Sequence, residues 1–112
     1  MDVLNFVEKA LNVRVFNHKV LAGNIAHVET PNYKEKEVDF KQALEGQMAG
    51  LKNIEIHEIT ESDSVGSVDG NTVNMEVQMV KMNENSMMYN ALISAITRRF
   101  SLMRYMITEG KR

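Results

Sequence analysis

A stripe of regularly spaced side chains in the last third of the chain constrains its fold more than any other feature. From residue 75 to residue 107 the spacing within the stripe alternates between four and three. Its members are Met75, Met79, Met82, Ser86, Tyr89, Ile93, Ile96, Phe100, Met103 and Ile107. All except Ser86 are apolar, and no Gly or Pro lies between Asn74 and Glu109. A repeat of 3.5 residues sustained over several heptads is typical of a coiled coil. This C-terminal stripe therefore predicts one helix about 50 Å long, with Gly110 just past its end.

The first residues of the chain predict a second amphipathic helix, over residues 3–26. An N-terminal stripe with the same spacing runs along it through Leu4, Val7, Leu11, Arg14, His18, Leu21 and Ile25. Asp2 suits the start of this helix, because its carboxylate can accept a hydrogen bond from an unpaired backbone N–H. We therefore expect a mainly α fold in which long N- and C-terminal amphipathic helices form a coiled-coil pair. An antiparallel hairpin within one chain and pairing between subunits would both satisfy the two stripes.

A turn is predicted soon after the first helix, at residues 30–33, which read Thr-Pro-Asn-Tyr. Pro31 fixes its own φ, and Asn32 tolerates the left-handed conformation, so this stretch favours a change of direction. Val38 and Phe40 then lie two residues apart in a charged stretch, which is consistent with a short extended segment.

Further short elements are predicted in the middle of the chain. Residues 41–50 favour a short helical piece that stops near Gly50. Ile54 and Ile56 alternate with polar neighbours, as in a short strand. Residues 61–72 are rich in turn-forming residues and are interpreted as a mobile linker.

Two regions are therefore expected. Residues 1–29 and 73–112 would form a helical coiled-coil core domain, and residues 30–72 a small region of turns, short strands and flexible loop. Between residues 53 and 76 there are six acidic residues and no Lys or Arg. This run is either a solvated loop or a surface for electrostatic docking.

Composition argues against several classes of function. The chain has 13 Lys and Arg residues against 15 Asp and Glu, and a net charge of -2 argues against a nucleic-acid binder. It has no Cys, which excludes a disulfide framework, a thiolate zinc site and a Cys nucleophile. The three histidines, His18, His27 and His57, lack the spacing of a metal site, and no Gly-rich phosphate loop is present. We therefore expect no enzyme, no catalytic residue, no metal and no cofactor.

The predicted C-terminal helix carries more apolar surface than one partner helix can cover. Beyond the stripe it has Met87, Met88, Leu92, Leu102 and Met106. Large exposed apolar patches mark interaction sites, so we expect assembly into a ring or an open filament. The alternative is that the stripe is the ordinary core of a self-sufficient fold. The residues expected at the assembly interface are Leu4, Val7, Leu11, Leu21, Ile25, Met75, Met79, Met82, Tyr89, Ile93, Ile96, Phe100, Met103 and Ile107.

Two stretches of the sequence resemble signatures of bacterial flagellar rod and hook proteins. Residues 22–34, followed by Val38-Asp39-Phe40, are similar to the N-terminal signature of that family. Residues 69–76 and the first half of the C-terminal helix are similar to the C-terminal signature of its proximal rod members. The motif residues are Asn24, Ile25, Ala26, Thr30, Pro31, Tyr33, Phe40, Gly70 and Asn71. The chain departs from the usual pattern at His27, where the family has Asn, and at Asn32, where it has Gly.

The resemblance implies a structural subunit of the proximal rod of the flagellar basal body that polymerises through its terminal helices. Its partners would be other rod subunits, the ring–rod junction adaptor and the flagellar type III export apparatus, in homo- and hetero-oligomers. The implied location is the periplasmic rod. No basic stretch followed by an apolar stretch is present at the N-terminus, so export without a cleaved signal peptide is expected. No apolar run approaches the roughly 20 residues of a membrane span, so no membrane insertion is expected. A small cytoplasmic coiled-coil adaptor or export chaperone is the alternative.

Overall fold

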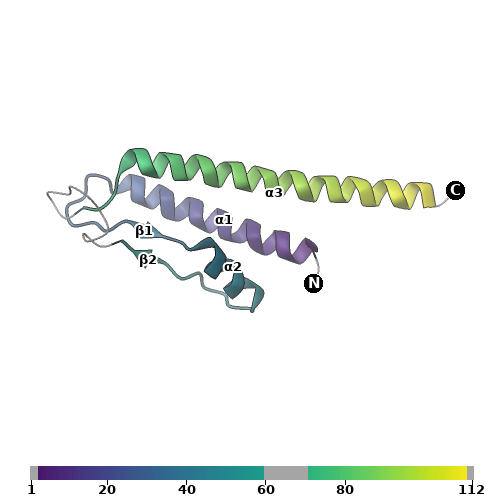
Figure 1. The fold of residues 1–112 in the computed structure, drawn as a ribbon, viewed down its shortest axis with the longest axis horizontal. Coiled ribbons are helices and arrows are strands. Elements are labelled where there is room, and N and C mark those ends of the chain that lie inside the picture. The colour runs from purple at the N-terminus through teal and green to yellow at the C-terminus, as the bar shows by residue number, and fades with distance from the viewer. Residues whose placement is uncertain (1–2, 60–70, 111–112) are drawn as a thin grey trace.

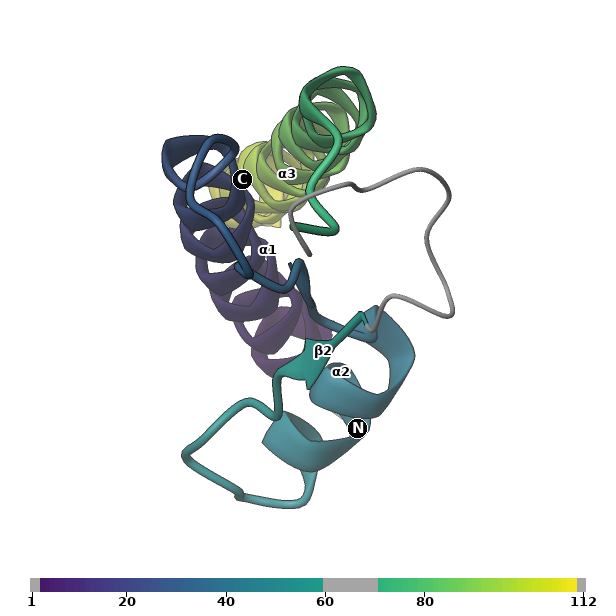
Figure 2. The same ribbon diagram turned by 90° about the vertical axis from the view of Figure 1, so that its left-hand side faces the viewer.

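The computed structural model describes residues 3–59 and 71–110 as a hairpin of two long helices with a small β-containing region packed against it. The elements are α1 (Val3–Ala26), β1 (Lys36–Glu37), α2 (Phe40–Met48), β2 (His57–Glu58) and α3 (Met75–Gly110). The helices α1 and α3 lie side by side and antiparallel, and the region between them in sequence packs mainly on α1 (Figures 1 and 2). The expectation of a mainly α fold with two long terminal helices is confirmed, and their pairing occurs within one chain.

Helix α3 extends well beyond its partner. It has 36 residues against 24 in α1, so its C-terminal end projects past the N-terminus of α1 (Figure 1). Every residue from 97 to 110 is exposed, and we call this segment the overhang. The radius of gyration is 18.4 Å, whereas a compact domain of about 100 residues has a value of about 13 Å. Gly110, expected just past the helix, is instead its last described residue.

The apolar core is small and centred on α1. Among the described residues, the buried apolar side chains are Val7, Ala10, Val13, Leu21 and Ala43. Val7 and Leu21 belong to the N-terminal stripe, whereas Ala10 and Val13 lie beside it. Because α1 contacts α3 on one side and α2 with β1 on another, a wider face of this helix is buried than one stripe provides.

The face that α3 turns toward α1 differs from the C-terminal stripe. Its buried residues are Gln78 and Asn85. The half-buried residues Met82, Tyr89, Leu92 and Ile96 complete a heptad pattern with them. Only part of the C-terminal stripe therefore pairs with α1 within the chain. The stripe shares Met82, Tyr89 and Ile96 with the observed face, whereas Met75, Met79, Ile93, Phe100, Met103 and Ile107 are exposed.

The short elements of the middle region are shifted from their predicted positions. The extended segment is β1, at Lys36–Glu37, and Phe40 instead begins α2. Asp39 precedes that helix and its side chain accepts a hydrogen bond from the Gln42 backbone N–H at 3.1 Å, which stabilises the helix start. The predicted helical piece is confirmed as α2, and the chain leaves it through Gly50, whose φ is +90°.

The second strand is likewise displaced. It is β2, at His57–Glu58, and it pairs antiparallel with β1 so that Lys36 opposes Glu58. Ile54 and Ile56, expected to form the strand, precede it. Most of the predicted mobile linker lies outside the described residues. Its last two residues, Asn71 and Thr72, are buried, so the linker interpretation is wrong for them.

Candidate functional site

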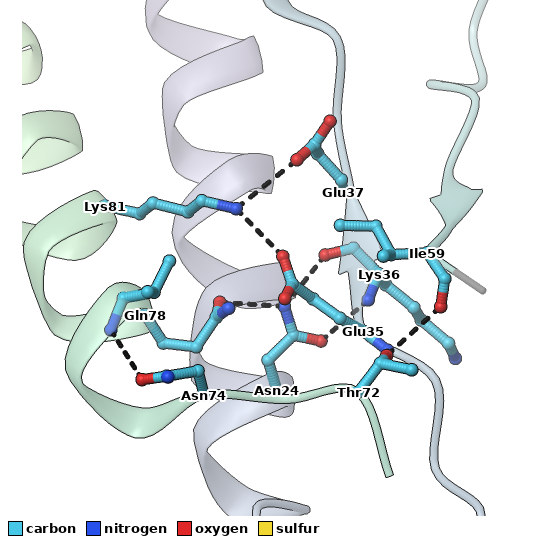
Figure 3. Close-up of polar contacts among 10 residues, drawn as sticks. Asn24, Glu35, Lys36, Glu37, Ile59, Thr72, Asn74, Gln78 and Lys81 are labelled. Atoms are coloured by element: carbon cyan, nitrogen blue, oxygen red, sulfur yellow. Dashed lines mark hydrogen bonds and ion pairs between the residues drawn. The ribbon is translucent and has the colours of Figure 1, made fainter. Parts of the chain in front are cut away.

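Asn24 joins the C-terminal part of α1 to β1. Its side chain is 0% exposed, and its Oδ1 accepts a hydrogen bond from the Lys36 backbone N–H at 3.0 Å. Its Nδ2 donates to the Lys36 carbonyl oxygen at 2.8 Å (Figure 3). The side-chain amide thus satisfies both backbone groups of one strand residue, as a neighbouring strand would. This pairing fixes the position of β1 along α1.

The same amide reaches α3. Asn24 Nδ2 also donates to Oε1 of Gln78 at 3.0 Å, and the Gln78 side chain is 0% exposed (Figure 3). A buried polar side chain without a partner costs free energy, so this contact favours one register between the two helices. Asn24 therefore connects three elements: α1, β1 and α3.

Thr72 lies on the other side of the segment that contains β1. Its backbone N–H donates to the Tyr33 carbonyl oxygen at 3.0 Å, and its Oγ1 accepts from the Glu35 backbone N–H at 2.7 Å. The same hydroxyl donates to the Ile59 carbonyl oxygen at 3.1 Å (Figure 3). Ile59 in turn donates its backbone N–H to the Glu35 carbonyl oxygen at 2.8 Å, continuing the ladder of β1 and β2. Thr72 thus ties the approach to α3 into the small sheet.

Asn71 binds the backbone just beyond α1. Its Nδ2 donates to the carbonyl oxygens of His27, Val28 and Thr30 at 2.9, 3.1 and 2.7 Å. Carbonyl groups near a helix C-terminus have no partner within the helix, and this amide gives them a donor. The His27 and Thr30 carbonyl oxygens also accept the backbone N–H groups of Thr30 and Tyr33. Its Oδ1 accepts from the Val73 backbone N–H at 2.7 Å, which holds the chain just before α3.

We call Asn24, Asn71, Thr72 and Gln78, with the backbone that they bind, the motif junction. It brings together two sequence motifs that lie more than 40 residues apart along the chain, as the separation of 41 residues between Asn71 and Thr30 shows. It involves residues of α1, β1 and α3 and the backbone of Ile59, just after β2. It therefore sets how α1, the small sheet and α3 are placed relative to one another.

The predicted turn between α1 and β1 is confirmed. Asn32 has a φ of 63°, the left-handed conformation that the sequence led us to expect. The Tyr33 backbone N–H donates to the Thr30 carbonyl oxygen at 3.3 Å. His27, the position at which the sequence departs from the motif that it resembles, stacks on the Tyr33 ring with 4.4 Å between centroids. The imidazole Nδ1 also lies 3.2 Å from the Thr30 hydroxyl, so this substitution makes contacts of its own.

A charged cluster borders the motif junction. Lys81 Nζ lies 2.8 Å from a Glu35 carboxylate oxygen and 3.3 Å from one of Glu37 (Figure 3). Burial by itself lowers the pKa of Lys81. The hydrogen bond and charge of Glu35, with a further contribution from Glu37, outweigh this effect and raise the pKa above its ordinary value of 10.5. The cluster joins α3 to the segment that contains β1.

A second polar contact lies midway along the hairpin. Asn85 Oδ1 accepts from Asn17 Nδ2 at 2.9 Å and from an Arg14 guanidinium nitrogen at 3.3 Å. Asn85 Nδ2 donates to the Arg14 carbonyl oxygen at 2.8 Å. The Arg14 guanidinium also stacks over the ring of Phe40, 3.8 Å from its centroid, and desolvation by burial lowers its pKa. Phe40, a motif residue, thereby anchors the start of α2 to α1.

The described motif residues lie in or near the motif junction, except Phe40, which lies at the start of α2. The predicted assembly residues differ in how far they are buried. Among them, Val7 and Leu21 are buried within the chain, and Leu11, Ile25, Met82, Tyr89 and Ile96 are half-buried. Leu4 and the remaining residues of α3 are exposed. Of the motif residues, Gly70 lies outside the described part of the chain.

Sequence reasoning gave no role to Gln78, Thr72, Glu35 or Lys81, and it missed the part that Asn85 plays between the helices. The available signal was that Gln78 and Asn85 lie seven residues apart in the heptad pattern of Met82 and Tyr89.

The described residues show no group of three or more His, Asp and Glu side chains that could hold a metal ion. Within residues 3–59 and 71–110, no helix combines the length and hydropathy that a membrane span requires.

Comparisons with known proteins identify the family. No family model matches the chain. The flagellar basal body rod protein FlgB of Bacillus subtilis (strain 168) is 29% identical over 94% of this chain and 92% of its own length. FlgB of Escherichia coli (strain K12) is 27% identical over 96% of this chain and 94% of its own length. FlgB of a strain of Cereibacter sphaeroides is 31% identical over 89% of each chain.

The chain belongs to the FlgB family of flagellar basal body rod proteins. The resemblance seen in the two motifs is therefore confirmed. The alignments with FlgB proteins cover nearly the whole chain, so both halves of the motif junction lie within a single family-wide match.

Proposed function

We propose that the chain is a structural subunit of the flagellar basal body rod and that it polymerises through its two terminal helices. Membership of the FlgB family supports the first part. The overhang, whose apolar side chains are exposed, supports the second. A structural subunit has no need of a catalytic centre, and its activity is its assembly.

The overhang is the observation that carries this proposal. Its exposed apolar residues are Phe100, Leu102, Met103, Tyr105, Met106 and Ile107. Because a helical turn contains 3.6 residues, residues at 102, 103, 105, 106 and 107 point to several sides of the helix. A helix that is apolar on several sides is normally buried within a larger structure. Neighbouring subunits would provide that environment.

The finer assignments follow from the sequence resemblance. The subunit would occupy the proximal rod, in the periplasm, and would contact other rod subunits and the ring–rod junction adaptor. The flagellar type III apparatus would export it without a cleaved signal peptide. The absence of Cys and the single Pro support this route, because they avoid slow disulfide and isomerisation steps in a chain that must be unfolded and refolded. The helical domain would comprise residues 1–29 and 73–112, and residues 30–72 would pack on it.

A substitution in the overhang tests polymerisation separately from folding. Ile107 is 59% exposed, so Ile107→Asp should leave the far-UV circular dichroism and the melting temperature of the monomer unchanged. In the assembled rod it would bury an unpaired carboxylate, so we expect loss of rod formation and of motility. Ile96→Asp is less informative, because Ile96 is half-buried near α1 and the hairpin itself would be weakened.

Leu51→Asp is the matched control, since Leu51 is 62% exposed and lies outside the terminal helices. Cells with this variant should swim normally. Fractionation supplies the second readout. A rod subunit should purify with basal bodies, whereas the alternative of a cytoplasmic adaptor or chaperone predicts a soluble protein. Normal motility with Ile107→Asp would show that the overhang is not an assembly surface.

A further inference from the structure

A groove with basic side chains lies between α1 and α3. Its volume is about 370 Å³, and none of its lining residues is acidic. The residues used below are Val15, His18 and Lys19 from α1 and Ser86, Tyr89 and Asn90 from α3, and we call this site the basic groove. Val15, His18 and Lys19 are exposed. The groove therefore offers an apolar floor with positive charge at its rim.

A surface of opposite character lies on the N-terminal half of α3. Glu76, Val77, Val80 and Glu84 line a shallow hollow there together with Lys81, and we call these four residues the acidic face. Val77 and Val80 are 42% and 56% exposed. Lys81 is already paired with Glu35 and Glu37, and none of the ion pairs among the described residues involves an acid of this face.

The acidic face and the basic groove cannot meet within one chain. Successive residues of an α-helix are about 100° apart, which places Val80 on the side of α3 away from Gln78 and Asn85, the residues that face α1. Glu84 lies on the flank of α3 that faces β1, where it also lines a hollow with Arg14 and Lys81. Ser86 and Asn90 of the groove project to yet another side of the same helix. Each surface is thus open to a second molecule while the hairpin stays intact.

We propose that the acidic face of one copy docks in the basic groove of the next copy. Val77 and Val80 would enter the groove between Val15 and Tyr89, and Glu84 would lie near Lys19 at its rim. A contact between two different surfaces of identical subunits is heterologous, and it can continue from subunit to subunit. The occupant is a second copy because this chain itself supplies complementary charge and apolar side chains. The inference rests on the proposed rod function and identifies one of the surfaces through which it would operate.

Charge reversal tests the contact. Lys19→Glu and Glu84→Lys should each weaken the association of purified protein, measured by sedimentation velocity, and should each reduce the yield of basal bodies. Exposed ion pairs are weak, and reversal replaces attraction by repulsion, so we expect a loss of about threefold to tenfold in the association constant. Combining both reversals in one chain should restore the association. Glu84 is preferred to Glu76, because Glu76 lies in the first turn of α3 and also interacts with the helix dipole.

Lys41→Glu is the matched control, since it makes the same charge change on the exposed surface of α2. Melting temperatures verify that each variant is folded. The natural absence of Cys allows a second, independent measurement. Lys19→Cys and Glu84→Cys proteins, mixed and oxidised, should form a mixed disulfide dimer more readily than either does alone. The control pair, Lys52→Cys mixed with Glu45→Cys, should show no such preference for the mixed disulfide dimer.

The outcomes separate the two proposals. If the single reversals have no effect, or if the double reversal fails to recover and no mixed disulfide forms, this contact is wrong while rod membership stands. If the unaltered chain is absent from basal bodies, the proposed function is wrong and this inference falls with it.

Discussion

The side-chain amide of Asn71 should contribute more to stability than any other single polar group of the motif junction. It is buried, and its Nδ2 lies within hydrogen-bond distance of three carbonyl oxygens beyond the end of α1. Its Oδ1 makes a separate local contact with the Val73 backbone N–H. Asn71→Asp keeps the local acceptor but replaces the donor with a second oxygen. This substitution therefore separates the tie to α1 from the local turn.

The expected loss follows from the hydrogen bonds that disappear. Two N–H groups serve three carbonyl acceptors, and each buried hydrogen bond contributes about 0.5–1.5 kcal/mol. The Val28 carbonyl oxygen adds a desolvation penalty if it is left without a donor, whereas those of His27 and Thr30 also accept a backbone N–H. Asn71→Ala should therefore lower the free energy of unfolding by about 2–4 kcal/mol. Asn71→Asp should lower it at least as much, because its carboxylate would face carbonyl oxygens. For a domain of this size, the melting temperature should fall by about 10 °C or more.

Thermal and urea unfolding of the monomer, followed by circular dichroism, measure both effects. Asn83→Ala is the control, because Asn83 is an exposed Asn of α3, and it should change stability by less than about 0.5 kcal/mol. A nearly normal stability for Asn71→Asp together with a large loss for Asn71→Ala would refute the reasoning. That result would mean that the local contact with Val73, rather than the tie to α1, stabilises the fold.

Asn32 and Lys81 carry two further predictions. Asn32→Gly should keep or raise the melting temperature. Asn32→Val should lower the free energy of unfolding by about 1–2 kcal/mol, because a β-branched side chain is strained at a φ of 63°. Equal stability of the two variants would contradict this expectation. The pKa of Lys81 is raised above 10.5 in the fold, so protonated Lys81 stabilises the folded state. This contribution to stability is fully present below pH 10.5 and is lost as the pH rises through the folded-state pKa. Urea unfolding from pH 9 to 12 measures the stability difference between the wild type and Lys81→Met, which should shrink above pH 10.5. Parallel plots of unfolding free energy against pH for the two proteins would exclude the ion pair as the source of that difference.

The helices could be predicted because their signal is local. The apolar repeat gave α1 its limits, and the apolar repeat together with the absence of Gly and Pro between Asn74 and Glu109 gave α3 its start. The turn was also predictable, since Asn32 is one of the few residues that adopts a positive φ without high cost. These features depend on neighbours in sequence and need no knowledge of the tertiary fold.

The contact face of α3 could not be predicted from its apolar pattern. Two adjacent stripes fit the repeat, and the one that packs on α1 contains Gln78 and Asn85. Their partners, Asn24 and Asn17, lie 54 and 68 residues away in sequence, so the only local signal is the heptad spacing that they share with Met82 and Tyr89. The same limitation applies to the strands. Two-residue strands have no detectable period, and backbone pairing alone places β2 at His57–Glu58, after the isoleucines that had suggested a strand.

The fully buried residues of α3 where it meets α1 are polar, and many apolar residues lie exposed on its remaining surface. Buried polar pairs specify register and contribute less to stability than apolar packing of the same volume. The Gln78 and Asn85 contacts therefore define how the hairpin is aligned, while only a few apolar side chains are buried within it. The proposed association of subunits would consequently bury most of the apolar surface that α3 leaves exposed in the hairpin. Substitutions at the motif junction should thus act on folding of the monomer, and substitutions in the overhang should act on assembly.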